Sequence, residues 1–169
     1  MKKNVLIFGL ALGTILCINM IIMVNMMYTN PEFKSNDLLG YAFMVVIFSL
    51  IFFGVRNYRD KELGGIISFG KAFKTSLLIA LVASTLYVVV WMFYFYLFVP
   101  DFIDKYTAHV LHQCTSESEM AEKTKQMESF SEMYENPIFV VLITYSEVLP
   151  VGVIVGLISS LVLKKKNKA

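Results

Sequence analysis

The sequence predicts an all-α membrane protein: a four-helix transmembrane bundle with an extracytoplasmic helical hairpin between the third and fourth spans. Hydrophobic residues make up 57% of the 169 residues and charged residues only 17%, against about 45–50% and about 25% in soluble domains. The mean hydropathy is +0.64. The apolar residues gather in four blocks, and each block reaches the roughly 18 residues needed to cross a bilayer. We therefore expect residues 1–169 to form a single membrane domain.

Each block must be helical, because a backbone in hydrocarbon has to pair its N–H and C=O groups within its own segment. The four predicted spans are Val5–Tyr28, Leu38–Val55, Thr75–Phe98 and Pro137–Leu163. The first follows two lysines in the manner of a signal peptide, but its apolar run is too long and no small-residue cleavage site follows it. We expect it to be retained as a span.

Positive charge predicts the side of the membrane on which each connection lies. Eleven of the fifteen basic residues lie at the termini or in the second connection: Lys2, Lys3, Arg56, Arg59, Lys61, Lys71, Lys74, Lys164, Lys165, Lys166 and Lys168. Ten acidic residues share the other two connections with the remaining four basic residues, Lys34, Lys105, Lys123 and Lys125. Because cytoplasmic loops attract the Lys and Arg excess, we expect both termini in the cytoplasm of a bacterial inner membrane.

Aromatic residues mark the outer ends of the spans. The run Trp91–Phe98 closes the third span, and Tyr28 and Tyr41 fall at the same level. Such rings favour the headgroup zone of a bilayer, so we interpret them as an interface belt. An aromatic cofactor box is the alternative interpretation.

The outer segment, residues 100–136, is predicted to form two helices. Asp101 follows a proline and is a candidate N-cap for the first helix. Ser116 and Glu119 make a capping box that opens the second helix, and Asn136 ends it before Pro137. The segment is too acidic to bind nucleic acid. We expect it to cap the bundle, and a docking surface for an exported partner is the alternative.

The two histidines of the chain lie in this outer segment. His109 and His112 are three residues apart, and Cys114 follows two residues later. Zinc and copper accept nitrogen and sulfur ligands from such a cluster, which makes these three residues a candidate metal site. Without a fourth ligand at fixed spacing, two solvent-facing histidines explain the pattern as well, and we expect no cofactor. Cys17 lies within the first span and is predicted not to reach Cys114.

Glu147 is the one acidic residue inside a predicted span. It lies ten residues into the fourth span, about 15 Å at 1.5 Å per residue, and so near the midplane. We expect it to face the bundle interior or a water-filled cavity and to be largely protonated. Hydroxyls at similar depth, those of Thr14, Ser84 and Thr85, are its predicted partners. Its role is either structural or that of a proton or cation relay, with Pro150 favouring a kink beside it.

Two glycine pairs predict close helix packing. Gly9 and Gly13 in the first span, and Gly152 and Gly156 in the fourth, are each four residues apart. Small residues at this spacing let helix backbones approach closely. Both pairs lie in the inner half of the membrane at overlapping depth. We therefore expect the first and fourth spans to contact each other through these glycines.

Several stretches together resemble one known family. They are the second connection from Gly54 to Lys74, the run from Trp91 to Tyr94, Pro100-Asp-Phe, and Glu147-Val-Leu-Pro150. The chain resembles, over nearly its whole length, a bacterial membrane family catalogued as domain of unknown function 4199. The resemblance implies a four-span inner-membrane protein and supplies no activity or site residues.

No catalytic motif is visible in the sequence, so an enzyme is the least supported class of function. We expect a non-enzymatic structural or accessory membrane component. Its predicted partners are the lipid bilayer and either further copies of the chain or another envelope protein. The alternative is a small oligomeric transporter or channel that uses Glu147 as an intramembrane proton or cation site.

Overall fold

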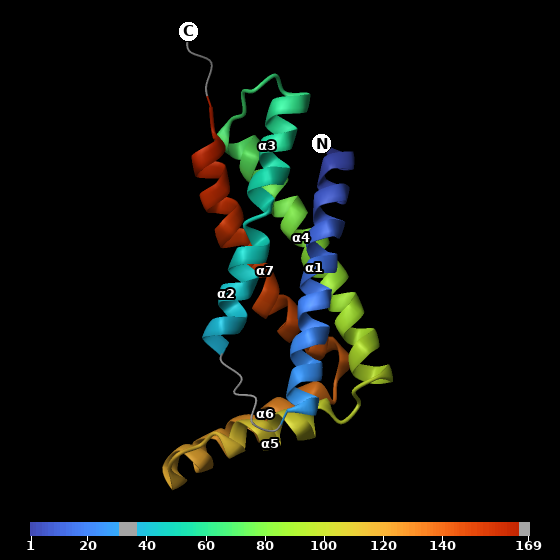
Figure 1. Cartoon of the computed structure of the whole chain (residues 1–169), viewed down its shortest axis with the longest axis vertical. Coiled ribbons are helices and arrows are strands. Elements are labelled where there is room, and N and C mark those ends of the chain that lie inside the picture. Colours follow the sequence, from blue (N-terminus) through green and yellow to red (C-terminus); the bar gives the residue numbers. More distant parts are fainter. Residues whose placement is uncertain (31–36, 166–169) are drawn as a thin grey trace.

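The computed structural model describes residues 1–30 and 37–165, and it is built from helices packed into one elongated body (Figure 1). The described residues form α1 (Lys2–Thr29), α2 (Asp37–Phe48), α3 (Ile51–Glu62), α4 (Phe69–Leu97), α5 (Phe102–His112), α6 (Glu117–Tyr134) and α7 (Pro137–Leu163). The predicted positions of Lys34, Lys166 and Lys168 lie outside the described residues.

Within the described residues, four helical stretches are long and apolar enough to cross a membrane: α1, α2 with α3, α4, and α7. The fourth span has the bounds predicted for it, and α4 begins six residues earlier than predicted, after Ser68, whose Oγ accepts a hydrogen bond from the N–H of Lys71. The start of α1, the end of α7 and the α3–α4 connection lie at one end of the body, which we call the termini end (Figure 1). Helices α5 and α6 cross the opposite end, called the hairpin end.

The second span is not the continuous helix that the sequence predicts, because it breaks at Ser49 and Leu50 and then extends to Glu62. At the break the backbone changes from i→i+4 to i→i+3 bonding: the N–H of Leu50 donates to the carbonyl of Ile47 (3.1 Å), and that of Phe52 to Ser49 (3.0 Å). The Ser49 hydroxyl also donates to the carbonyl of Val46. A serine that bonds to a nearby carbonyl competes with regular helix bonding, and it is the local cause of the break.

Helix α4 is the centre of the bundle, and both α1 and α7 pack along it. A Cβ atom added to Gly9 would lie 2.6 Å from Cγ1 of Val82 in α4. One added to Gly156 would lie 2.9 Å from Cβ of Ser76, on the same helix. The expectation that the two glycine pairs contact each other is therefore wrong.

The reason is that α4 lies against both glycine pairs. On the α7 side its small residues Ala80 and Ser76 approach Gly152 and Gly156. On the α1 side the larger Val82 and Leu86 fill the space left by Gly9 and Gly13, so each glycine pair packs against a different side of α4.

The termini end has a tightly packed core. Its most buried side chains have exposures of 0–2% and come from α1, α2, α3, α4 and α7: Leu12, Leu16, Phe48, Ile51, Val55, Ile79, Ala80, Ala83 and Val148. Large apolar side chains such as Ile7, Val46, Phe53 and Ile158 face outward. This outward apolar surface is what a helix bundle presents to lipid.

The α3–α4 connection holds the last turn of α7. The N–H of Lys165 donates to the carbonyl of Ile67 (2.9 Å), and the N–H of Ile67 donates back (3.2 Å). Nη1 of Arg59 donates to the carbonyl of Leu163 (3.3 Å). Gly64 and Gly65 reverse the chain before this contact, with φ of +64° and +88°, values that favour glycine.

Helices α5 and α6 pack against each other and against the end of the bundle. The carboxylate of Asp101 does not cap α5; it accepts a hydrogen bond from the Tyr28 hydroxyl of α1 (2.8 Å). Oγ of Ser116 caps α6 by accepting from the N–H of Glu119 (3.2 Å), as predicted. The Glu119 carboxylate bonds the N–H and hydroxyl of Thr115, and these bonds hold the pKa of Glu119 below its usual value.

Candidate functional site

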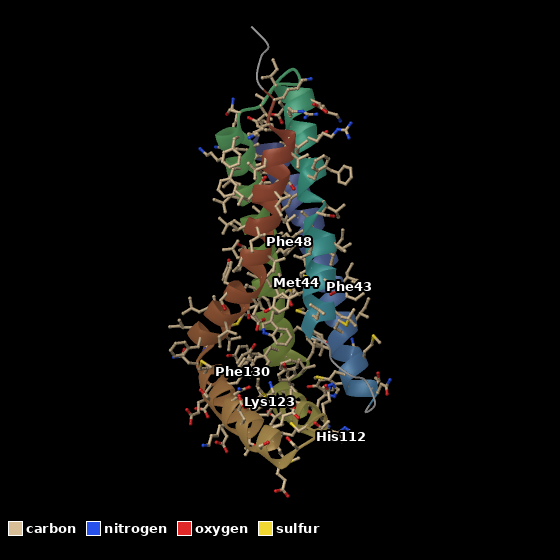
Figure 2. The ribbon with its side chains drawn as sticks, turned by 90° about the vertical axis from the view of Figure 1, so that its left-hand side faces the viewer. Phe43, Met44, Phe48, His112, Lys123 and Phe130 are labelled. Carbon is tan, nitrogen blue, oxygen red and sulfur yellow. The ribbon has the colours of Figure 1, made fainter. Side chains whose placement is uncertain are left out.

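A cavity of about 390 Å³ lies at the hairpin end, where the bundle meets α5 and α6. Helices α1 and α2 contribute methionines to its wall, among them Met20, Met23 and Met44. Helices α5 and α6 close it with aromatic rings. In Figure 2, Met44 lies on the bundle side of the cavity and Phe130 on the hairpin side.

The aromatic rings of the cavity form one connected cluster. The ring centroids of Trp91 and Phe102 are 4.9 Å apart in an edge-on arrangement, and Phe102 stacks on Tyr106 at 5.7 Å. From the second outer helix, Phe130 lies 4.5 Å from Tyr134 and 6.2 Å from Tyr106. Helices α5 and α6 each place two of these rings four residues apart, on one helical face. We call this cluster the aromatic roof: Trp91, Phe102, Tyr106, Phe130 and Tyr134.

The outer-belt interpretation does not hold for the whole Trp91–Phe98 run, and for its exposed residues it stays a prediction. Phe93 and Phe98 are 64% and 71% exposed and suit a bilayer interface. Trp91 and Phe95 are each only 6% exposed and pack under α5 and α6 instead. The physical reason is helical periodicity, because one face of α4 meets the hairpin while the other faces outward.

Glu147 lines the cavity from α7, one helical turn from Thr144, which also lines it. The Glu147 side chain is exposed, so it borders the cavity without being enclosed by it, and its orientation toward the bundle interior stays a prediction. Tyr87 and Tyr134 line the same cavity. Burial, and then the Glu147 carboxylate, raise the pKa of Tyr134 above its ordinary value. Protonation of Glu147 itself stays a prediction.

The predicted hydroxyl partners of Glu147 are wrong. The Thr14 hydroxyl donates to the carbonyl of Leu10 (2.8 Å), and the Thr85 hydroxyl donates to the carbonyl of Leu81 (2.7 Å). Thr85 also accepts from the Tyr145 hydroxyl. Serine and threonine in helices commonly bond the carbonyl four residues back, which here uses the proton that the acid would need.

Ser84 is a different case. Its side chain is completely buried, and its Oγ has no hydrogen-bond partner within the described residues. It therefore does not pair with Glu147 either. Matching depth along the spans does not fix which face of a helix a hydroxyl occupies.

The candidate metal ligands do not converge. His109 is buried and its Nε2 lies 2.7 Å from Nε2 of Gln113, whereas His112 is exposed. The Cys114 thiol donates to the carbonyl of Val110 at 3.6 Å. In residues 1–30 and 37–165, no three His, Cys, Asp or Glu side chains form a group that could hold a metal ion. Cys114 lies beyond the end of α5 at His112, and its thiol bonds the backbone of that helix instead of joining the histidines.

Sequence reasoning missed the cavity because six helices build it. Helical spacing places Tyr106, Phe130 and Tyr134 on the apolar faces of α5 and α6, but spacing does not tell what those faces contact. The usable signal was the combination of Glu147 and Trp91, both polar or amphipathic side chains within spans.

Comparison with known proteins identifies a family but no individual relative. The model of a family described as Protein of unknown function (DUF4199) matches residues 6–165. No curated protein and no solved structure matches the chain.

Proposed function

We propose that this chain, which belongs to the DUF4199 family of proteins of unknown function, is a non-enzymatic membrane component that binds one small amphiphilic molecule. The observation that supports this proposal is the cavity at the hairpin end, whose volume of about 390 Å³ suits a small ligand. Seven aromatic and four methionine side chains line it beside a few polar groups. Apolar walls with a few placed polar groups are typical of ligand sites.

The lining offers little for catalysis. Among the described residues, its titratable groups are Glu147 and four tyrosines. General acid–base and nucleophilic catalysis need a reactive group held in place by a second, oriented group. Binding needs only a shaped apolar space and a few polar contacts, and the lining supplies both.

A transporter or channel that uses Glu147 as a proton or cation site is the second candidate, favoured by the place of this acid in the cavity lining. Toward the termini end, however, Phe48, Ile51 and Val148 are completely buried. Figure 2 shows Phe48 beyond Met44 in that direction. A pathway through this layer would require the packed helices to separate, so binding is the better supported function.

The proposed setting is a bacterial inner membrane, with both termini and the α3–α4 connection in the cytoplasm and with α5 and α6 outside. Support comes from the basic residues of the termini end and the acidic residues of α6. In the bilayer the chain would act with further copies or with another envelope protein.

A labelling experiment tests the orientation. In a Cys114→Ser background, in which the remaining Cys17 is buried, a cysteine placed at exposed Ser118 should react with an impermeant maleimide in intact spheroplasts. A cysteine placed at exposed Lys61 should react only after lysis. The reverse pattern would overturn the proposed orientation.

The binding proposal can be tested through Trp91, the single tryptophan of the chain, which lines the cavity. The probe is N-phenyl-1-naphthylamine, an uncharged aromatic molecule that accepts energy from tryptophan, titrated into protein in dodecyl maltoside micelles. We expect transfer that saturates at one probe per chain. Transfer that only rises linearly, as for partition into the micelle, would overturn the proposal.

Two glycine variants provide the matched comparison. Gly40 lines the cavity, and a Cβ there would meet no atom within 4 Å, so Gly40→Leu should occupy space in the cavity and weaken probe binding. Gly70, at the start of α4, is equally open but outside the cavity, so Gly70→Leu should leave binding unchanged. Equal effects of the two changes would contradict the proposed site.

A further inference from the structure

The cavity lining contains an acidic side chain and no basic one. Glu147 is its single acidic residue, and no Lys, Arg or His lines it in the part of the chain that the structure describes. An anionic ligand would therefore meet a like charge and find no cation to pair with. The lining favours a ligand that is neutral or positively charged.

The aromatic roof favours a positively charged ligand over a neutral one. The face of an aromatic ring is electron-rich and attracts a cation placed within about 6 Å of its centroid. Trp91, which gives the strongest such interaction, has its ring centroid 4.9 Å from that of Phe102. Phe130 and Tyr134 of α6 complete the cluster and line the same cavity as Glu147. The carboxylate and the rings thus surround one space, as in the aromatic cages that bind quaternary ammonium groups.

From this arrangement we infer that the ligand of the cavity is an amphiphilic organic cation, held between the Glu147 carboxylate and the aromatic roof, with its apolar part against Met20, Met23 and Met44. The inference rests on the binding function proposed above. A carboxylate accepts several hydrogen bonds, so a cation can join whatever other partners Glu147 has. The flexible, polarisable methionines suit an apolar part of variable shape.

A bare metal ion fits the same lining poorly. Calcium and magnesium take six or more oxygen ligands, and the described residues contain no cluster of three acidic, His or Cys side chains. A cation whose charge is spread over methyl or methylene groups needs no such shell. It gains from ring faces and from one carboxylate, and the cavity provides both.

Cation binding should depend on pH through Glu147. The titratable groups that line the cavity are Glu147 of α7 and the tyrosines of α2, α4, α5 and α6, namely Tyr41, Tyr87, Tyr106 and Tyr134. Tyrosines titrate near pH 10 when unperturbed, so Glu147 is the group that changes charge below pH 9. A proton and the cation compete for its carboxylate, and affinity for the cation should rise with pH.

Two ligands of the same shape test the charge preference. Benzyltrimethylammonium and neopentylbenzene differ only in a positively charged nitrogen where the second has a neutral carbon. Each is titrated against bound N-phenyl-1-naphthylamine in dodecyl maltoside micelles, with displacement read from Trp91 energy transfer. We expect the cation to bind at least tenfold more tightly than its neutral counterpart at pH 8, and benzenesulfonate to bind more weakly than either.

Variants then test which residues produce the preference for the cation. Glu147→Gln should reduce the preference for the cation to about twofold and remove its pH dependence, while neopentylbenzene binds as before. Phe130→Leu should weaken binding of the cation about threefold or more. Glu128→Gln removes an exposed acid of α6 outside the cavity and should change nothing.

The outcomes separate the two proposals. Saturable binding of both ligands with equal affinity, or a preference for the cation that survives Glu147→Gln, would overturn the cation site and leave the cavity as a binding site. Tighter binding of benzenesulfonate than of benzyltrimethylammonium would also overturn the cation site and leave the cavity as a binding site. Failure of the naphthylamine probe to bind at all would overturn both.

Discussion

At the termini end, α4 meets α7 through glycine, alanine and serine, whereas at the hairpin end tryptophan, phenylalanine and methionine lie between α4 and its neighbours. A Cβ at Gly152 would lie 2.9 Å from Cβ of Ala80, so the backbones there are close. At the other end Trp91, Phe95 and Met20 pack beside a cavity of about 390 Å³. Small residues produce a closed contact between helices, and large rings hold helices far enough apart to leave space for a ligand.

The largest effect is expected when a large side chain is placed at a close helix contact of the termini end. A Cβ at Gly152 would already lie 2.8 Å from Cε1 of Phe48, so Gly152→Leu should destabilise the protein by about 3 kcal/mol through overpacking. Gly40→Leu, at the cavity, should change stability by less than about 0.5 kcal/mol. Unfolding by dodecyl sulfate in mixed micelles measures both, and equal destabilisation would show that the two ends do not differ in packing.

The attachment of the hairpin to α1 is the next test. Tyr28→Phe removes the hydrogen bond to the Asp101 carboxylate (2.8 Å) and should destabilise the docking of α5 by about 1.5 kcal/mol. Amide hydrogen exchange over α5 would report this as faster exchange. Tyr96→Phe, at a 44% exposed position on α4, is the control. Equal exchange in both variants would mean that the bond does not hold the hairpin.

Two buried serines of α4 sharpen the description of the packed end. The Ser76 hydroxyl lies 3.0 Å from that of Ser160 and bonds the carbonyl of Ala72, so Ser76→Ala should cost about 1 kcal/mol. The equally buried Ser84 has no partner among the described residues, so Ser84→Ala should be neutral or slightly stabilising. Thermal unfolding in micelles distinguishes them, and a loss of stability in Ser84→Ala would reveal a partner for its hydroxyl.

The smallest expected effect is a pH dependence of the hairpin. Burial, and then His112, lower the pKa of His109 below its ordinary value of 6.5. The unfolded hairpin therefore binds a proton more readily, and stability is fully present above pH 6.5 and falls as the pH drops toward the lowered pKa. Limited proteolysis of α5 should be faster at pH 5 than at pH 8. His109→Gln should remove most of this difference, and an unchanged pH dependence would contradict the assignment.

The spans and the outer helices could be predicted because hydropathy and capping residues act locally. Pro137 and Leu163 bound α7 as predicted, and Ser116 caps α6. Neither the bounds of α7 nor the cap of α6 depends on which helices are neighbours.

The packing order and the site could not be predicted in this way. Gly9 and Gly156 were matched to each other by depth, but both contact α4, because depth does not determine the face of a helix. Ser49 lies in an apolar span, and hydropathy does not reveal that its bond to the carbonyl of Val46 interrupts the helix. The cavity depends on side chains from six helices, and no single segment of sequence encodes it.

The break between α2 and α3 divides this span into two helices joined by a short turn. Beyond the joint, α3 is fixed by Ile51 and Val55, which are completely buried. Before it, α2 exposes Leu38, Leu39 and Val46 and supplies Met44 to the cavity wall. A segment joined by an i→i+3 turn can change its tilt while the hydrogen bonds of its neighbour stay intact. The turn thus divides one span between two tasks: Met44 lies beside the ligand space, whereas Phe48 at the turn and Ile51 beyond it seal the bundle.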